Sequence, residues 1–254
     1  KWYHVINVDK KTYAARRDLD FDSNPNYELI DEDICDIKHL PVNIDYIVNF
    51  AAESHVDNSI IANKVFLDSN IYWVYNLLEL VRSKWVDDRP KFIHISTDEV
   101  YWDIDEWTCD ENSRTKASNP YSATKAAAEQ LIFAWDRTYW IEYIICRSSN
   151  NYWYGQYPEK LMPKTIEYLL QDKKMTIHWD GSYKREWTYA GDNVEWIILA
   201  MEKWELWEIY NISSWEEHGN LTIVKKILNE LAMPDDYFTH VENRIWQDTR
   251  SVSY

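Results

Sequence analysis

Short apolar runs alternate with longer segments of helical periodicity along this 254-residue chain. Runs rich in β-branched and aromatic residues predict strands at 3–8, 27–30, 44–52, 92–96, 140–146 and 209–212. Apolar positions with a period near 3.6 predict helices at 64–84, 120–134, 161–171, 192–203 and 220–231. Strands and helices that alternate at these lengths are typical of a doubly wound, mostly parallel sheet. The pattern therefore predicts an α/β fold of the Rossmann-like kind.

The pattern of polar and apolar residues changes after Arg147. Residues 148–158, SSNNYWYGQYP, are polar and aromatic without a period, which predicts a loop. We expect residues 1–147 to form the Rossmann-like domain and residues 148–254 to form mainly a smaller α/β lobe. The segment 188–212 is expected to return to the first domain.

Two groups of reactive side chains lie between residues 91 and 130. Thr97, Asp98 and Glu99 follow a predicted strand, and Tyr121 and Lys125 lie near the start of a predicted helix. Residues four apart share one helix face, and a Lys ammonium there would lower the pKa of the Tyr hydroxyl toward general-base work. Two adjacent carboxylates could divide acid and base roles. Alternatively, all five are ordinary surface side chains.

Composition excludes some function classes. The chain has 43 acidic and 27 basic residues and a formal net charge of -16, so its field repels nucleic acid, and an anionic ligand needs local Arg or Lys. Cys35, Cys109 and Cys146 form no C-x-x-C pair, which argues against a disulfide framework or a metal site and favours a cytoplasmic location. We expect no membrane helix, because no apolar run approaches ~20 residues, and the first ten residues do not resemble a signal peptide.

Several segments carry a family resemblance. In order along the chain, FAAESHVDNSI, HISTDEVY, NPYSATKAAAE, SSNNY, QYPEKLMPKTI and YNIS resemble the dTDP-glucose 4,6-dehydratases, which are extended short-chain dehydrogenases. The resemblance spans nearly the whole chain, and the Thr-Asp-Glu triplet is more specific than Tyr-x-x-x-Lys. It implies an NAD-dependent hydro-lyase that acts on dTDP-glucose and forms homodimers through the helices near 64–84 and 120–134.

The resemblance also implies roles. Tyr121, helped by Lys125 and Thr97, would take the proton of the sugar 4-hydroxyl while hydride leaves C4. Glu99 would then remove the C5 proton, Asp98 would protonate the departing 6-hydroxyl, and hydride would return to C6. Two alternatives stay open. One is a related nucleotide-sugar epimerase or decarboxylase, which the acidic pair disfavours, and the other is a nucleotide-sugar binding protein without turnover.

Further site residues follow from the resemblance, and no metal site does. Asp9 also ends a predicted strand, where a dinucleotide-binding fold carries its ribose-binding acid. The residues expected at NAD are Asp9, Lys10, Lys11, Thr12, Asp33, Ile34, Phe50, Ala51, Ala52, Glu53, Ser54, Ser69, Tyr121, Lys125 and Asn151. Those expected at the sugar nucleotide are Ser54, Thr97, Asn150, Lys160, Leu161, Arg185, Asn211, Asp248 and Arg250.

Glycine and tryptophan usage departs from the family. The chain has 15 Trp and only 4 Gly. The glycine-rich phosphate loop of the family would precede Lys1. Family glycines are expected at the positions of Trp73, Trp102, Trp153, Trp179, Trp207, Trp215 and Trp246. Because Trp is penalised where a turn needs positive φ, we expect strain that impairs folding or activity, and Trp102 could displace the acidic pair.

Overall fold

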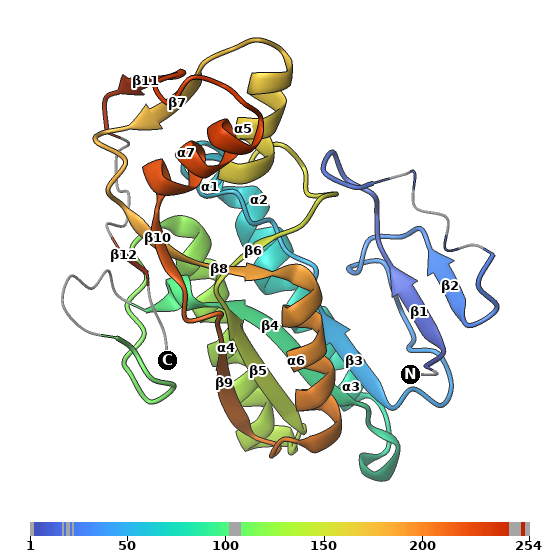
Figure 1. Ribbon diagram of the computed structural model, residues 1–254. Helices are drawn as coiled ribbons and strands as arrows, with labels where there is room; N and C mark the ends of the chain where they lie inside the picture. The colour runs from blue at the N-terminus through green and yellow to red at the C-terminus, as the bar shows by residue number, and fades with distance from the viewer. Residues whose placement is uncertain are drawn as a thin grey trace.

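The main sheet of the molecule is parallel and four-stranded. The computed structural model describes residues 3–16, 18, 21, 23–101, 108–243 and, for the backbone only, 250–251. The strands β3 (Tyr46–Asn49), β4 (Lys91–Thr97), β5 (Tyr143–Ser148) and β9 (Glu208–Ile212) lie in the order β3-β4-β5-β9, and every pair is parallel. A separate parallel pair, β1 (Val5–Val8) and β2 (Tyr27–Ile30), lies beside β3 (Figure 1).

Helices cover both faces of this sheet, because successive apolar residues of β4 point to opposite faces and both are buried. Phe92 packs with helices α3 (Trp73–Arg82) and α4 (Pro120–Tyr139). Its neighbour Ile93 points to the other face and packs with α6 (Ala190–Lys203). Successive strand residues face opposite sides, so a strand that is buried on both faces carries an unbroken apolar run. The predicted doubly wound α/β fold is confirmed.

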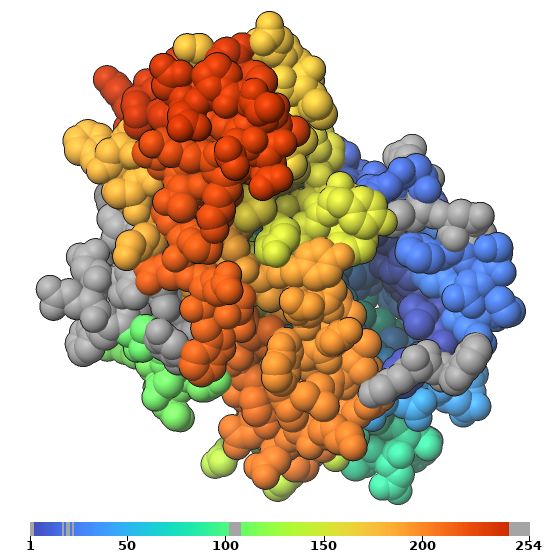
Figure 2. Space-filling view, viewed as in Figure 1, coloured from blue at the N-terminus to red at the C-terminus, as the bar shows by residue number. Residues whose placement is uncertain are grey.

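A second layer of structure sits over the carboxyl ends of the strands. Helices α5 (Leu161–Leu170) and α7 (Asn220–Glu230) pack around Leu169, Val224 and Leu228 against the parallel pair β7 (Met175–His178) and β11 (Phe238–Val241). Strand β8 (Lys184–Tyr189) connects this lobe to the sheet and pairs with β6 (Asn150–Tyr152), β10 (Glu217–Gly219) and β12 (Arg250–Ser251). Figure 2 shows this lobe above α6, with β1 and β2 to one side. The proposed domain boundaries stay a prediction.

The segment predicted as one helix at 64–84 is three elements. After α1 (Val56–Ile61), which the sequence pattern did not predict, α2 (Asn63–Leu67) runs into a π-helical turn at Asp68–Tyr72 and then into α3. The π-turn turns Asn70 inward, where its Nδ2 donates to Glu53 O at 2.9 Å and to Thr124 Oγ1 at 2.9 Å. Single π-turns of this kind are frequent at functional sites.

Helix α4 extends beyond its predicted end to Tyr139, and β5 starts at Tyr143 rather than at Trp140. Trp140 ends the helix in the left-handed conformation, with φ 61°, and its N–H donates to Asp136 O at 2.7 Å. Glycine normally occupies this capping position. The predicted loop at 148–158 likewise contains β6.

Three further tryptophans share this backbone conformation. Trp179 has φ 53°, Trp207 has φ 64° and Trp215 has φ 65°, and all three side chains are exposed. These three turns have the backbone conformation that glycine favours. Trp73 and Trp153 do not have positive φ, and Trp73 is a buried residue of α3. The expectation of family glycines at all of these positions stays a prediction. Trp102 and Trp246 lie outside the described residues.

None of the described helices is both long enough and apolar enough to cross a membrane.

Candidate active site

Both reactive groups face one cavity of about 560 Å³ at the carboxyl ends of the sheet strands. Thr97 ends β4, and the single 3₁₀ turn Asp98–Val100 follows, capped by the Thr97 hydroxyl, which accepts from Glu99 N at 3.2 Å. Tyr121 and Lys125 lie one turn apart on α4. Asn119 caps that helix by accepting from Ser122 N at 3.0 Å, and Pro120 occupies its first position.

Tyr121 does not have the lowered pKa that the sequence predicted. Burial raises its pKa well above the usual range, and the Glu99 carboxylate adds to this effect, while the Thr97 hydroxyl opposes it. The ammonium of Lys125 is itself buried, which lowers its pKa to about 8. Burial and nearby carboxylates therefore outweigh the expected effect of the lysine, and Tyr121 is protonated in the ligand-free chain.

The two carboxylates of the triplet lie in different surroundings. Asp98 is buried and accepts from the Thr97 hydroxyl at 3.2 Å. Burial raises the pKa of Glu99, as does the charge of Asp98, whereas Arg185 and Lys160 act in the opposite direction. Glu99 Oε2 is buried and has no hydrogen-bond partner among the described residues. The raised pKa and the unpaired oxygen make Glu99 a candidate to exchange a proton with a bound molecule.

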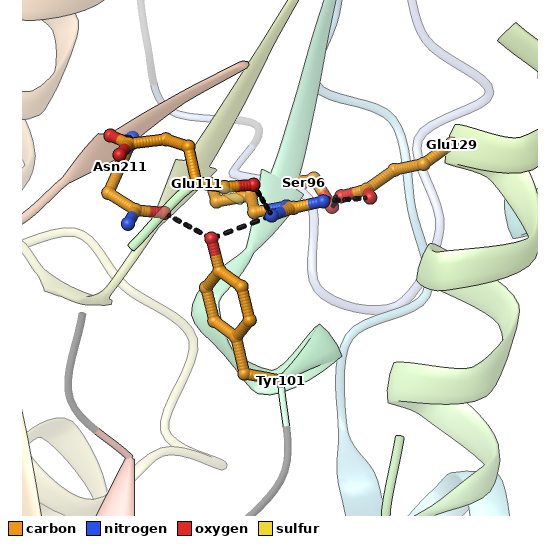
Figure 3. A network of polar contacts seen from close by, with 6 residues as sticks. Ser96, Tyr101, Glu111, Glu129 and Asn211 are labelled. Carbon is orange, nitrogen blue, oxygen red and sulfur yellow. Dashed lines mark hydrogen bonds and ion pairs between the residues drawn. The ribbon is translucent and has the colours of Figure 1, made fainter. Parts of the chain in front are cut away.

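A buried ion pair supports the catalytic strand from behind (Figure 3). Arg147 of β5 donates to Glu129 of α4 through Nε at 3.0 Å and through Nη2 at 2.7 Å, and Ser96 Oγ donates to the same carboxylate at 2.5 Å. Arg147 Nη1 also donates to the Tyr101 hydroxyl at 2.6 Å, which in turn donates to Asn211 Oδ1 at 2.9 Å. The network ties β4, β5 and α4 to the segment after the acidic pair. Sequence reasoning missed Glu129 and Arg147, although a charge at the end of an apolar strand is a usable indication.

The cavity brings together thirteen of the predicted site residues. Besides the five reactive ones, its lining includes Phe50, Ala52, Ser54, Asn150, Asn151, Lys160, Leu161 and Arg185. Asn150 Nδ2 and Asn151 Oδ1 are buried without a hydrogen-bond partner among the described residues. Such orphaned polar atoms fit a site that a polar ligand completes.

The other predicted residues lie outside this lining. They are Asp9, Lys10, Lys11, Thr12, Asp33, Ile34, Ala51, Glu53, Ser69 and Asn211. Ile34 packs in the main core, and Ser69 Oγ is buried and donates to Asn70 Oδ1 at 3.1 Å, so both side chains are used by the scaffold. Lys10 Nζ pairs with Asp33 Oδ2 at 2.9 Å. Asp248 and the side chain of Arg250 lie outside the described residues.

Among the side chains that the structure describes, no three His, Cys, Asp or Glu residues are grouped so that they could hold a metal ion.

Fold and site together define an α/β enzyme of the sugar-nucleotide-modifying, extended short-chain dehydrogenase class. The profile of the GDP-mannose 4,6 dehydratase family matches residues 1–249, and the chain belongs to this family. A dTDP-glucose 4,6-dehydratase of Haemophilus influenzae is 39% identical over 275 residues, which cover 97% of this chain and 80% of that protein. The resemblance to dTDP-glucose 4,6-dehydratases is confirmed.

Solved structures agree with this assignment. The dTDP-glucose 4,6-dehydratase DesIV from Streptomyces venezuelae, solved with NAD bound, is 33% identical, with a TM-score of 0.94 over 99% of this chain and 79% of that one. A UDP-glucuronic acid 4-epimerase from Bacillus cereus has a TM-score of 0.88 over 99% of this chain and 82% of that one, at 24% identity. That second likeness shows the shared fold alone.

Proposed function

We propose that this chain is an NAD-dependent hydro-lyase that converts dTDP-glucose to dTDP-4-keto-6-deoxyglucose. The observation that carries the proposal is the single cavity that holds Thr97, Asp98 and Glu99 together with Tyr121 and Lys125. Hydride chemistry alone needs the Tyr-Lys pair, whereas elimination of water also needs an acid and a base. The family membership and the dehydratase relatives support the same reaction.

The residues at the carboxyl ends of the sheet strands fit NAD. Asp9, at the carboxyl end of β1, would hold the adenosine ribose. Phe50, Ala52, Ser54 and the buried, unpaired Asn151 Oδ1 would hold the part nearest Tyr121. NAD held by these residues would supply the hydride acceptor and donor that the reaction needs.

The proton steps involve five side chains. Tyr121 would receive the proton of the sugar 4-hydroxyl, and the Lys125 ammonium would favour the phenolate that this step needs. The Thr97 hydroxyl acts on the Tyr121 oxygen, where it favours the same phenolate. Glu99, whose Oε2 is unpaired, takes the C5 proton after C4 has become a ketone. Asp98 gives a proton to the departing 6-hydroxyl.

Cationic side chains in the cavity wall suit a nucleoside diphosphate. Arg185, Lys160 and Lys164 all line the cavity of this strongly acidic protein. A guanidinium that can bond two phosphate oxygens at once holds a diphosphate well. Asn150 and Leu161 share this wall and would contact the sugar nucleotide.

The test is incubation of the 254-residue protein with NAD and, separately, dTDP-glucose, UDP-glucose and GDP-mannose. Alkaline absorbance of a 4-keto sugar from dTDP-glucose alone is the expected result. Conversion to dTDP-galactose would instead support an epimerase, and binding without a product would support a sugar-nucleotide binding protein. Either outcome would overturn the proposed reaction.

We also propose a homodimer that forms through α4 together with α2, the π-turn and α3. Val65, Leu67 and Tyr72 are exposed apolar side chains on these adjoining elements, and a self-complementary helix face is the usual basis of a two-fold dimer. Light scattering after size exclusion should give twice the chain mass, and Val65→Glu should halve it.

Free thiols at Cys35, Cys109 and Cys146 support the further proposal of a reducing, cytoplasmic location.

A further inference from the structure

His94 is a buried titratable residue that the proposed reaction does not use. It lies on β4, is fully buried, and stacks on Phe92 at a ring-centroid distance of 6.2 Å and an interplanar angle of 11°. Its two ring nitrogens face different residues. Nδ1 lies 3.3 Å from Asn49 Nδ2, and Nε2 lies 3.4 Å from Lys125 Nζ.

Lys125 has few other partners in this region. Its Nζ donates to Ile95 O at 2.6 Å, so the strand supplies one acceptor through its backbone and a second through the His94 ring. Of the titratable groups around Nζ, His94 comes from β4 and Glu129 from α4, while Glu99 and Asp98 act on Tyr121 from the 3₁₀ turn. Burial and the nearby Lys125 charge keep the pKa of His94 well below its usual value, so the imidazole is neutral.

A neutral imidazole has one N–H and one acceptor nitrogen, and the two arrangements differ in their consequences. If Asn49 Nδ2 donates to Nδ1, the ring proton is on Nε2, where it opposes the N–H groups of the Lys125 ammonium. In the same arrangement Asn49 Oδ1 is buried with no hydrogen-bond partner among the described residues.

The other arrangement avoids the opposition between Nε2–H and the Lys125 ammonium. The amide of Asn49 occupies the same space when it is turned by half a rotation. Its Oδ1 then accepts from Nδ1–H, and the lone pair of Nε2 accepts from the ammonium. A buried ammonium needs acceptors to remain charged, and this arrangement provides two.

We propose that His94 is a positioning residue for Lys125, with a neutral ring that carries its proton on Nδ1 and accepts an ammonium N–H on Nε2. Asn49 selects this tautomer from the opposite side of the ring. The consequence for catalysis rests on the proposed function, in which Lys125 supports the Tyr121 phenolate. The tautomer itself does not depend on any reaction.

The tautomer is tested by NMR of the full chain labelled with ¹⁵N-histidine. The His94 resonances are assigned by their loss in His94→Gln. Nδ1 is expected to be protonated and Nε2 unprotonated, and Lys125→Met is expected to move the Nε2 resonance while Nδ1 stays protonated. A ring that is protonated on Nε2, or on both nitrogens, would overturn the proposal. This result stands even if the protein forms no 4-keto sugar.

Two substitutions separate positioning from packing. The Gln amide reaches the place of Nε2 and can accept from Lys125, whereas the Asn amide reaches only the place of Nδ1. Loss of one hydrogen bond to a charged group predicts that His94→Asn lowers kcat about tenfold, with a smaller change in KM. The alkaline limb of the pH–kcat profile of His94→Asn should move to lower pH. His94→Gln should restore most of kcat and most of the position of that limb. Equal losses in two variants with the same melting temperature would refute a role through Lys125.

Discussion

The left-handed cap at Trp140 allows a direct measurement of backbone strain. Trp140 has φ 61° and its side chain is 78% exposed, so replacement by glycine removes little buried apolar surface. An L-residue in this conformation destabilises the folded chain by about 1–2 kcal/mol. Glycine removes this strain but destabilises the folded state by about 0.5–1 kcal/mol, because it raises the entropy of the unfolded chain. Trp140→Gly should therefore stabilise the protein by about 0.5–1 kcal/mol.

The same reasoning applies to Trp179, Trp207 and Trp215, which also have positive φ. Contributions from separated sites add approximately, so the fourfold variant should gain about 2–4 kcal/mol. Urea unfolding followed by far-ultraviolet circular dichroism avoids the change in fluorescence. Trp85 is the matched control, because it is 84% exposed but has φ -58°, and Trp85→Gly should destabilise. Equal effects at Trp85 and Trp140 would show that the strain argument is wrong.

Three other side chains give independent tests. Glu99→Gln should abolish exchange of the C5 proton with deuterated solvent while substrate binding is retained, and unchanged exchange would rule out Glu99 as the base. Arg147→Met leaves the Glu129 carboxylate buried without its partner and should cost about 3–5 kcal/mol in urea unfolding, most of which Glu129→Leu in the same chain should restore. Lys125 has a folded pKa of about 8 against 10.5 in a model peptide. Between these values the unfolded chain binds more protons, so this residue's contribution to stability rises with pH, by roughly 3 kcal/mol in total. Lys125→Met should lose that rise, and a wild-type pH dependence in the variant would contradict the shift.

Local patterns were enough to predict the fold and the reactive groups. The largely apolar run of β4 and the helical spacing of Tyr121 and Lys125 both depend on neighbours in sequence, and a strand and a helix form at these positions. The direction of the Tyr121 pKa could not be predicted in this way. It depends on Glu99, which is 22 positions earlier in the chain (121 minus 99) and comes close only through the fold.

The same reason explains the residues that sequence reasoning missed. Asn49, His94 and Lys125 come from β3, β4 and α4, and each reads in isolation as an ordinary strand or helix residue. Glu129 and Arg147 likewise meet only across the helix and sheet interface. The π-turn at Asp68–Tyr72 lies between α2 and α3, and the apolar pattern of the sequence did not predict it.

The left-handed tryptophans also bear on how the gene is translated. UGA, a stop codon that some genetic codes read as tryptophan, differs from the glycine codon GGA only in its first base. If the host reads UGA as glycine, UGA should encode positions 140, 179, 207 and 215, where φ is positive. UGG should encode Trp135, whose indole donates to Glu79 at 2.8 Å from within α4. Codon identity and the peptide masses of the protein from its native host would then show glycine at the turns and tryptophan in the helix.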